Sequence, residues 1–285
     1  MSTTLSEPLK GRAVFTRIWK LTLRRVLFPL CVLAPFAYVF PKIALFYAIC
    51  GAYDVSRNGG LKLSTLRRYF IGNGFLLWLL SPINTLLDVL SLPYINRGVY
   101  RLDDLPPDYQ DEVRRLLRVT DDADLVRRLE QRSQDHKRTM FSWRWYGIKS
   151  EEAAVDVPGF DGPWKYVKTI GLSVFNKKTT TSPHFGWLRP TLRLLYNIND
   201  MKDKSAYIVV GNATNYWCNN KLFIFDDTLL HISANETDQP RYCMFVDIVR
   251  PTLFPRAMAA VVALEAFLNW QFKFIRFSGW TLVGR

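Results

Sequence analysis

Five short runs between residues 166 and 248 restrict the fold more than any other feature of the chain. They are rich in β-branched and aromatic residues, polar segments bearing Gly and Asn separate them, and they cover 166–175, 191–198, 206–210, 222–225 and 242–248. Many short strands at this spacing indicate a sandwich or jelly roll rather than alternating strands and helices. We therefore expect an α+β, mainly β fold whose jelly-roll domain occupies residues 161–255.

Two of the three histidines lie inside this β-rich segment. His184 opens the stretch that runs into 191–198, and His231 follows the run 222–225. The mouth of a jelly roll brings side chains of different strands together, and neutral imidazoles bind Fe(II) while leaving positions for oxygen and a chelating cosubstrate. Arg193 and Arg241 follow the two histidines by nine and ten residues, and each can pair bidentately with a carboxylate. The pattern predicts a non-haem iron site, although spacing alone leaves structural or surface roles open for both histidines.

Composition excludes several other classes of protein. The net charge is +13 and the pI about 9.7, but the basic residues flank apolar runs, so an anionic membrane surface is favoured over nucleic acid. Neither GxGxxG nor GxxxxGK[ST] occurs, which argues against a dinucleotide or NTP enzyme, and GxSxG is also missing. The four cysteines show no CxxC spacing, so they indicate neither a zinc ribbon nor a disulfide framework.

The N-terminal part is apolar enough to predict contact with a membrane. Residues 26–50 carry Lys42 as their single charge and are long enough for a transmembrane helix, although three prolines interrupt them. A second apolar run, 70–94, predicts a half that enters the bilayer and an interfacial amphipathic half. Basic residues on both sides of the first run fit a re-entrant hairpin or two spans, and a buried pair of soluble helices is the alternative.

Two further segments complete the predicted layout. Leucines at helical spacing in the charged stretch 103–140 predict one or two exposed amphipathic helices, with His136 at the surface. The apolar run 255–280 predicts a helix that packs on the barrel or rests at a lipid interface. The expected domains are a membrane-associated helical region, a helical linker, the jelly roll and a C-terminal apolar helix, over residues 1–98, 99–160, 161–255 and 256–285.

A set of motifs in the β-rich segment resembles a known enzyme family. The motifs are His184-Phe-Gly186, Leu192-Arg193-Leu, Trp217, Phe225-Asp-Asp-Thr-Leu-Leu-His231, Asn235-Glu-Thr, Arg241 and Asp247-Ile-Val-Arg-Pro251. Together they resemble the aspartyl/asparaginyl β-hydroxylase family of Fe(II)/2-oxoglutarate dioxygenases, nearest its lipid A 2-hydroxylase and ornithine lipid hydroxylase branch, over residues 160–255. Ser81-Pro-Ile-Asn-Thr-Leu resembles the membrane-proximal segment of that branch more weakly. The resemblance implies a cupin-like double-stranded β-helix.

The resemblance also implies a role for particular residues. His184 and His231 would bind Fe(2+), and Arg241 would hold the distal carboxylate of 2-oxoglutarate, with Arg193 and Ser173 nearby. Asp227 would orient an iron-bound water. Position 186 carries an acid in lipid A 2-hydroxylases but glycine here, as in peptide β-hydroxylases, and Leu195 stands where the family often has histidine.

The expected activity is hydroxylation, by molecular oxygen, of an acyl chain of a membrane lipid such as lipid A or ornithine lipid. The expected location is a membrane, the inner membrane in a bacterium, with the catalytic domain facing the cytoplasm and no nucleic-acid partner. Two alternatives stay open. One is a peptidyl-aspartyl/asparaginyl or amino-acid β-hydroxylase, and the other is a membrane-anchored binding protein without catalysis.

Overall fold

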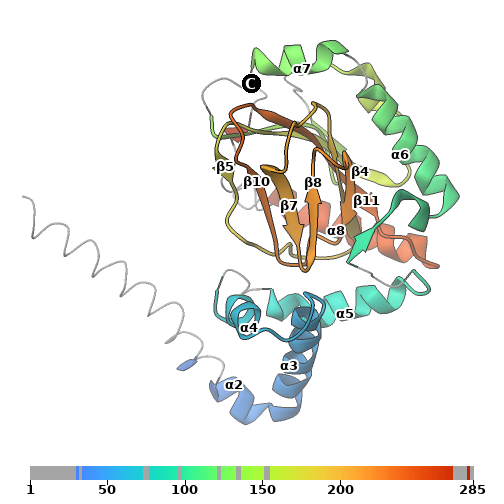
Figure 1. The fold of residues 1–285 in the computed structure, drawn as a ribbon. Helices are drawn as coiled ribbons and strands as arrows, with labels where there is room; N and C mark the ends of the chain where they lie inside the picture. Colours follow the sequence, from blue (N-terminus) through green and yellow to red (C-terminus); the bar gives the residue numbers. More distant parts are fainter. Residues whose placement is uncertain are drawn as a thin grey trace, which may run out of the picture. The chain divides into compact units, whose positions relative to one another are not determined.

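The computed structural model describes residues 30–31, 34–72, 77–94, 98–120, 123–132, 136–150, 155–271 and 281–282. The chain divides into two compact units (Figure 1). The first consists of residues 1–56 and 60–82, and the second of residues 57–59 and 83–285. The predicted β-rich segment lies wholly in the second unit.

The second unit is built around two sheets whose pairings are antiparallel, except that β12 and β2 run parallel. The larger sheet has the order β1 (Val99–Tyr100), β9 (Leu222–Phe225), β6 (Thr191–Asn197), β11 (Arg241–Val249), β4 (Val167–Phe175), β2 (Arg138–Trp145) and β12 (Thr281–Leu282), with β3 (Ile148–Lys149) paired to β2. The smaller sheet has the order β5 (Thr179–Thr180), β10 (His231–Asn235), β7 (Ala206–Val210) and β8 (Ala213–Tyr216). From β4 to β11 the chain passes back and forth between the sheets, which is the topology of a jelly roll.

The strand order confirms the predicted double-stranded β-helix, and all five predicted runs are strands. Sequence reasoning missed β2, β8 and β10 and the two-residue strands β1, β3, β5 and β12. His231 was expected just after a strand, but it begins β10. The larger sheet also extends beyond the predicted range 161–255, because β1, β2 and β3 come from the stretch assigned to the helical linker and β12 from the predicted C-terminal segment.

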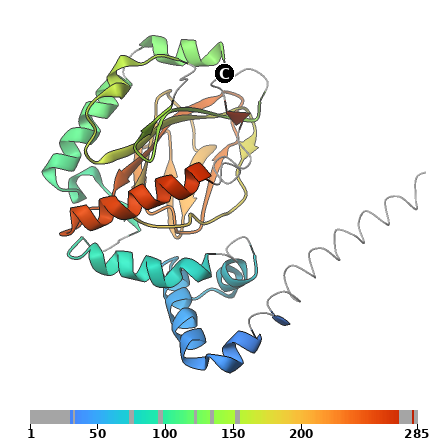
Figure 2. The same ribbon diagram turned by 180° about the vertical axis from the view of Figure 1, so that it is seen from behind.

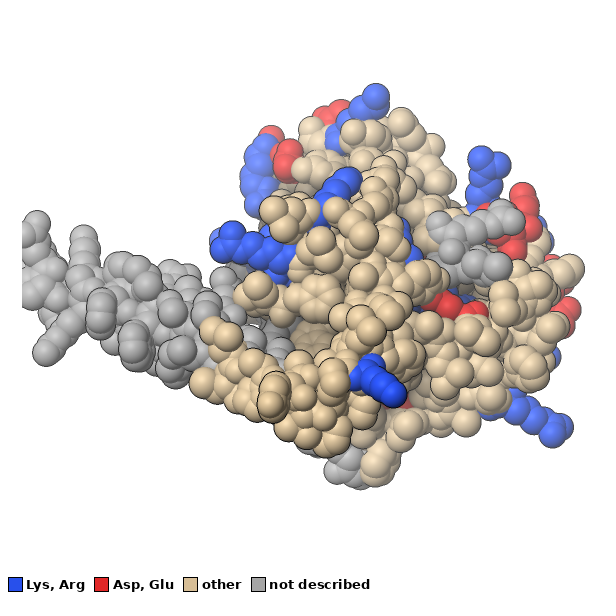
Figure 3. All heavy atoms as spheres, turned by 90° about the horizontal axis from the view of Figure 1, so that it is seen from below, with Lys and Arg blue, Asp and Glu red and all other residues tan. Residues whose placement is uncertain are grey.

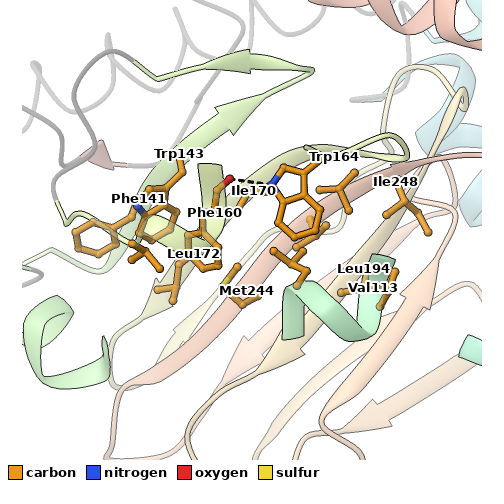
Figure 4. Packing of buried hydrophobic residues seen from close by; sticks show 14 of the residues in the cluster. Val113, Phe141, Trp143, Phe160, Trp164, Ile170, Leu172, Leu194, Met244 and Ile248 are labelled. Atoms are coloured by element: carbon orange, nitrogen blue, oxygen red, sulfur yellow. Dashed lines mark hydrogen bonds between the residues drawn. The ribbon is translucent and has the colours of Figure 1, made fainter. Parts of the chain in front are cut away.

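The outer face of the larger sheet carries the main hydrophobic core. Alternate residues of β11, namely Tyr242, Met244, Val246 and Ile248, point to this face and are buried. Side chains of α6 (Pro107–Val119), α7 (Ala123–Glu130), β2, β4 and the 3₁₀-helix η5 (Pro158–Asp161) pack with them. Figure 4 shows part of this cluster, including the bond of 2.8 Å that the Trp164 indole N–H donates to the carbonyl of Phe160.

The predicted helices of the charged stretch are α6 and α7, and they are not fully exposed. Leu116, Leu125 and Leu129 are buried in the core cluster. The outer face of the sheet is apolar and needs a cover, so both helices turn their leucines toward it. The remaining short helix of this region is η4 (Leu102–Asp104).

The last helix, α8 (Pro255–Gln271), packs on the same unit together with α5 (Ser81–Leu90). Leu87 of α5 forms a small cluster with Val249, Met258 and Val262. Figure 2 shows α8 in front of the strands with α5 beside it. Of the predicted C-terminal run, residues 272–280 lie outside the described residues.

The first unit contains α2 (Ala34–Val39), α3 (Pro41–Ser56), α4 (Leu63–Phe70) and η3 (Trp78–Leu80). The apolar run 26–50 is interrupted at a proline, as its sequence indicates, because Pro41 begins α3 after Phe40. No helix of the described residues is both long and apolar enough to cross a bilayer. Residues 26–29 and 32–33 of that run lie outside the described part of the chain.

Glu112 of α6 ties this helix to the start of β4. Its buried carboxylate accepts three backbone N–H bonds, from Lys165 at 3.0 Å and from Tyr166 and Val167 at 2.7 Å each. Glu112→Ala leaves these donors without their acceptor, so we expect a loss of roughly 1–3 kcal/mol in the free energy of unfolding. Urea denaturation measures it, with the exposed Arg114→Ala as the control. Equal midpoints for Glu112→Ala and the control would contradict this role.

Candidate active site

The structure brings the two predicted histidines together at the start of β10. The backbone N–H of His184 donates to the carbonyl of His231 at 3.0 Å, and the N–H of His231 donates to the carbonyl of His184 at 2.9 Å. Residues paired in this way direct their side chains to the same face. The imidazole centroids are accordingly 4.2 Å apart.

Both imidazoles are held in the tautomer that suits a metal. Nδ1 of His184 lies 2.8 Å from the carbonyl oxygen of Ser182, and Nδ1 of His231 lies 2.8 Å from that of Leu229. Each Nδ1–H therefore donates to backbone and leaves Nε2 with its lone pair. Burial lowers the pKa of both imidazoles, that of His231 well below its ordinary value, so both rings are neutral near pH 7. Two neutral imidazoles of this kind are a donor set that fits Fe(II).

Gly186 leaves the space beside the histidine pair to Asp227. The N–H of Gly186 donates to the carbonyl of Asp227 at 2.7 Å. A Cβ at position 186 would lie 2.6 Å from the carboxylate carbon of Asp227. The carboxylate of Asp227 therefore occupies the space that a side chain at position 186 would need. In the described part of the chain, no group of three or more His, Cys, Asp or Glu side chains is arranged to hold a metal.

Arg193 holds Asp227 in place. Its Nη2 lies 3.0 Å from Oδ2 of Asp227, its Nε donates to Oδ1 of Asp247 at 2.8 Å, and its guanidinium stacks over Phe245 at 4.0 Å. Burial opposes the charge of Arg193, but the two carboxylates outweigh it and raise its pKa. The predicted contact of Arg193 with a cosubstrate stays a prediction, since the structure gives this residue two carboxylate partners.

Arg241 has no such partner among the described residues. It lies on the inner face of β11 with only 1% of its surface exposed, and its Nε and Nη1 make no hydrogen bond. Phe175 and Trp217 flank its guanidinium at 4.3 and 5.2 Å. A buried cation without a counter-charge is costly, so a carboxylate ligand fits here. The 2-oxoglutarate that the family resemblance implies offers such a carboxylate.

Ser173 lies next to this guanidinium in the sheet register. It faces Cys243 across the strand pair, two positions from the pairing of Arg241 with Phe175, and its hydroxyl donates to the carbonyl of Cys243 at 3.1 Å. Residues so paired lie on one face of the sheet, so Ser173 and Arg241 both point inward. The predicted anchor residues are thus on the inner face of the larger sheet.

Sequence reasoning missed the buried ion network that holds the loop before His231. Asp226 accepts from Arg57 and Arg250 at 2.6 Å each. Burial alone would raise the pKa of Asp226, but Arg250 and then Arg57 outweigh it and hold the pKa well below its usual range. Asn58 also accepts the N–H of Leu230 at 2.7 Å. The signal in the sequence was the paired acid Asp226-Asp227 followed by Thr228, which forms an Asx-type turn.

A second missed group is Glu265 of α8. Its carboxyl accepts a hydrogen bond from Tyr146, and its neighbouring charges are those of Asp227, Asp247 and Arg193. Burial, with Asp227 as the next cause, raises its pKa to about 8. No sequence pattern linked position 265 to the site, because the contact depends on how α8 packs.

The family model described as aspartyl/asparaginyl beta-hydroxylase matches residues 108–251. The chain belongs to this family. As a β-hydroxylase family member it is 32% identical over 133 residues to the ornithine lipid ester-linked acyl 2-hydroxylase of Rhizobium tropici. The matched part covers 44% of this chain and 43% of that relative, so less than half of the relative is spanned.

Two solved structures have a distant likeness to this β-hydroxylase family member. The TT1209 protein of Thermus thermophilus gives a TM-score of 0.28 at 11% identity, covering 43% of this chain and 95% of that one. A Cupin 2 conserved barrel domain protein of Salinispora arenicola gives 0.25 at 15%, covering 37% and 80%. The assignment of the fold therefore depends on the strand order described above.

Gly186→Ala tests the close approach of Asp227. The added methyl would collide with the carboxylate, which Arg193 holds, so we expect a loss of about 1–3 kcal/mol in the free energy of unfolding. Gly162→Ala is the control, because its Cβ would meet Trp164 at an ordinary 3.4 Å. Chemical denaturation of both variants compares them, and similar stability would show that the site tolerates a side chain at 186.

Glu265 predicts a pH dependence of stability. Its folded pKa of about 8 exceeds the ordinary value of 4.5, so the folded protein keeps a proton that the unfolded chain releases at lower pH. Stability therefore falls as the pH rises toward 8, by at most about 1.4 kcal/mol per pH unit. Burial also raises the pKa of Asp227, to about 6, so this carboxyl lowers stability in the same way over a lower pH range.

Urea midpoints of the metal-free protein at pH 6 and pH 8 measure this effect. Glu265→Gln carries no titrating proton and should lose less stability over this interval than the unmodified protein. Equal losses in the two proteins would mean that Glu265 does not titrate there.

Proposed function

We propose that the protein is a membrane-associated Fe(II)/2-oxoglutarate-dependent dioxygenase that hydroxylates an acyl chain of a membrane lipid. The observation that carries this proposal is the neutral pair His184 and His231, with both Nδ1–H groups tied to backbone. The lipid class is suggested by the relative from Rhizobium tropici, an ornithine lipid ester-linked acyl 2-hydroxylase.

Each residue of the site has a part in the proposed reaction. His184 and His231 would hold iron through Nε2, and Arg241 with Ser173 nearby would bind the distal carboxylate of 2-oxoglutarate. Bound iron and 2-oxoglutarate supply the oxidising power by which molecular oxygen hydroxylates an unactivated C–H bond. Asp227, fixed by Arg193, would orient a water beside the iron. The chain needs no nucleophile or acid–base pair for such chemistry.

Exposed apolar side chains support the membrane part of the proposal. In the first unit, large side chains of α2 and α3 face outward, with Tyr38 89%, Val39 62% and Leu45 61% exposed. Contiguous apolar surface of this kind is typical of contact with lipid or with another protein. A location at the inner membrane of a bacterium, with the catalytic domain on the cytoplasmic side, is part of the same proposal.

Succinate release from 2-oxoglutarate in detergent, with candidate lipids added, tests the enzyme class. We expect turnover that depends on Fe(II) and on lipid, and that His231→Ala reduces by at least about 100-fold because metal affinity falls. His136→Ala, at an exposed position, is the control. Equal succinate release from the His231→Ala variant and the unmodified protein would remove the iron proposal. Turnover with an aspartyl peptide but with no lipid would favour the peptide β-hydroxylase.

Arg241→Met tests the anchor for the cosubstrate. The substitution keeps an apolar side chain between Phe175 and Trp217 but removes the charge-assisted bonds, worth about 1.5–3 kcal/mol. We expect the KM for 2-oxoglutarate to rise roughly 10–100-fold, with iron binding retained. An unchanged KM would show that the dicarboxylate binds elsewhere.

A further inference from the structure

The outer face of α5 is an apolar stripe. Ile83, Leu86 and Val89 follow one another at intervals of three and are 46%, 57% and 55% exposed, and Leu92, just beyond the end of the helix, is 44% exposed. This spacing keeps the three helical side chains within about a third of the helix circumference. The opposite side is buried, with Leu87 in the cluster that joins α5 to α8.

The outer face of α8 has the same character. Leu264, Phe267 and Leu268 are 57%, 54% and 43% exposed, whereas Met258 and Val262 are buried against α5 and β11. Leu253 and Phe254, just before the helix, are 66% and 55% exposed. The two packed helices therefore both present large apolar side chains to solvent.

Both helices turn their acidic side chain inward. Asp88, which carries the one charge of α5, pairs with Arg189 at 2.7 Å and with Arg250 at 3.5 Å. The carboxyl of Glu265 lies against Tyr146, and one of its oxygens is buried without a hydrogen bond. What remains outside on α8 is Arg256, which is exposed and cationic. Figure 3 shows the molecule from below, where uncharged residues dominate the view and the charged side chains are scattered.

The stripe on α5 leads to the loop that carries His184. Asn84, next to Ile83, donates to the carbonyl of Trp187 at 3.1 Å and accepts the N–H of Arg189 at 3.2 Å. Trp187 is three residues beyond His184 and is 44% exposed. Tryptophan favours the boundary between lipid and water, because its ring is apolar and its N–H is polar.

We propose that the outer faces of α5 and α8, with Trp187, form the surface on which the catalytic domain rests against a lipid bilayer. We call it the α5–α8 surface. An apolar face without an exposed acid and with one cation suits an anionic bilayer, which repels carboxylates and takes up leucine and phenylalanine side chains. The inference rests on the proposed function, since it assigns the side from which a lipid acyl chain reaches the histidine pair.

Site-specific fluorescence tests the surface without any need for catalysis. Cys31 and Cys218 are first replaced by serine, while Cys50 and Cys243 stay because they are buried. Leu86→Cys, Phe267→Cys and, as a matched control, Ile148→Cys are labelled with an environment-sensitive dye in the full chain. Ile148 has a comparable exposure of 45% but lies on β3. Vesicles of phosphatidylethanolamine and phosphatidylglycerol are then added.

We expect a blue shift and protection from an aqueous quencher at positions 86 and 267, and neither at position 148. Labels at 86 and 267 that stay in water on vesicle-bound protein would overturn the proposal, as would protein that does not bind vesicles. Protection at 86 and 267 only in the presence of a second protein would assign the surface to a protein partner instead.

A substitution experiment separates this inference from the proposed function. Leu86→Glu combined with Leu264→Glu should lower turnover of a vesicle-embedded lipid at least tenfold and leave binding of 2-oxoglutarate unchanged, whereas Ile148→Glu should change neither. Full turnover by the double variant would contradict the α5–α8 surface. Inserted labels on a protein that never consumes 2-oxoglutarate would instead contradict the proposed enzyme.

Discussion

The pair of backbone hydrogen bonds between His184 and His231 is the interaction on which the site depends. These bonds join the segment between β5 and β6 to the first residue of β10, and they hold the two imidazoles side by side. A second constraint fixes the tautomer of both rings, because backbone carbonyls accept hydrogen bonds from both Nδ1–H groups. The two imidazole Nε2 atoms are then available together, at a place where burial keeps the rings neutral.

Buried charge surrounds this pair and is arranged in two networks. Asp226 is paired with Arg57 and Arg250 on one side, and Asp227 is paired with Arg193 on the other. Buried ions are costly unless partners surround them, so consecutive carboxylates with separate arginines fix the loop between β9 and β10. Arg241 lies apart with no carboxylate partner among the described residues, which is why a dicarboxylate cosubstrate fits there.

The sequence predicted those parts of the molecule that have a local pattern. The five β-rich runs and the leucine spacing of α6 and α7 are such patterns, and so is the histidine motif. β10 was missed because His-Ile-Ser-Ala-Asn has little β-branched or aromatic character, and β2 because it follows a charged stretch. The partners of Asp226 and the position of Glu265 come from segments far apart in the chain, and only packing brings them together. The expected membrane span is not found among the described helices, since Pro41 separates α2 from α3 and neither helix is long and apolar enough to cross a bilayer.

Anaerobic titration with Fe(II) and 2-oxoglutarate, followed by the visible absorbance of an iron–keto-acid complex, tests the central claim most directly. We expect the band to develop at one equivalent of iron in the unmodified protein, to vanish in His184→Ala and His231→Ala, and to need much more 2-oxoglutarate in Arg241→Met. An unmodified, folded protein that binds no iron, or a band that survives loss of both histidines, would contradict the account.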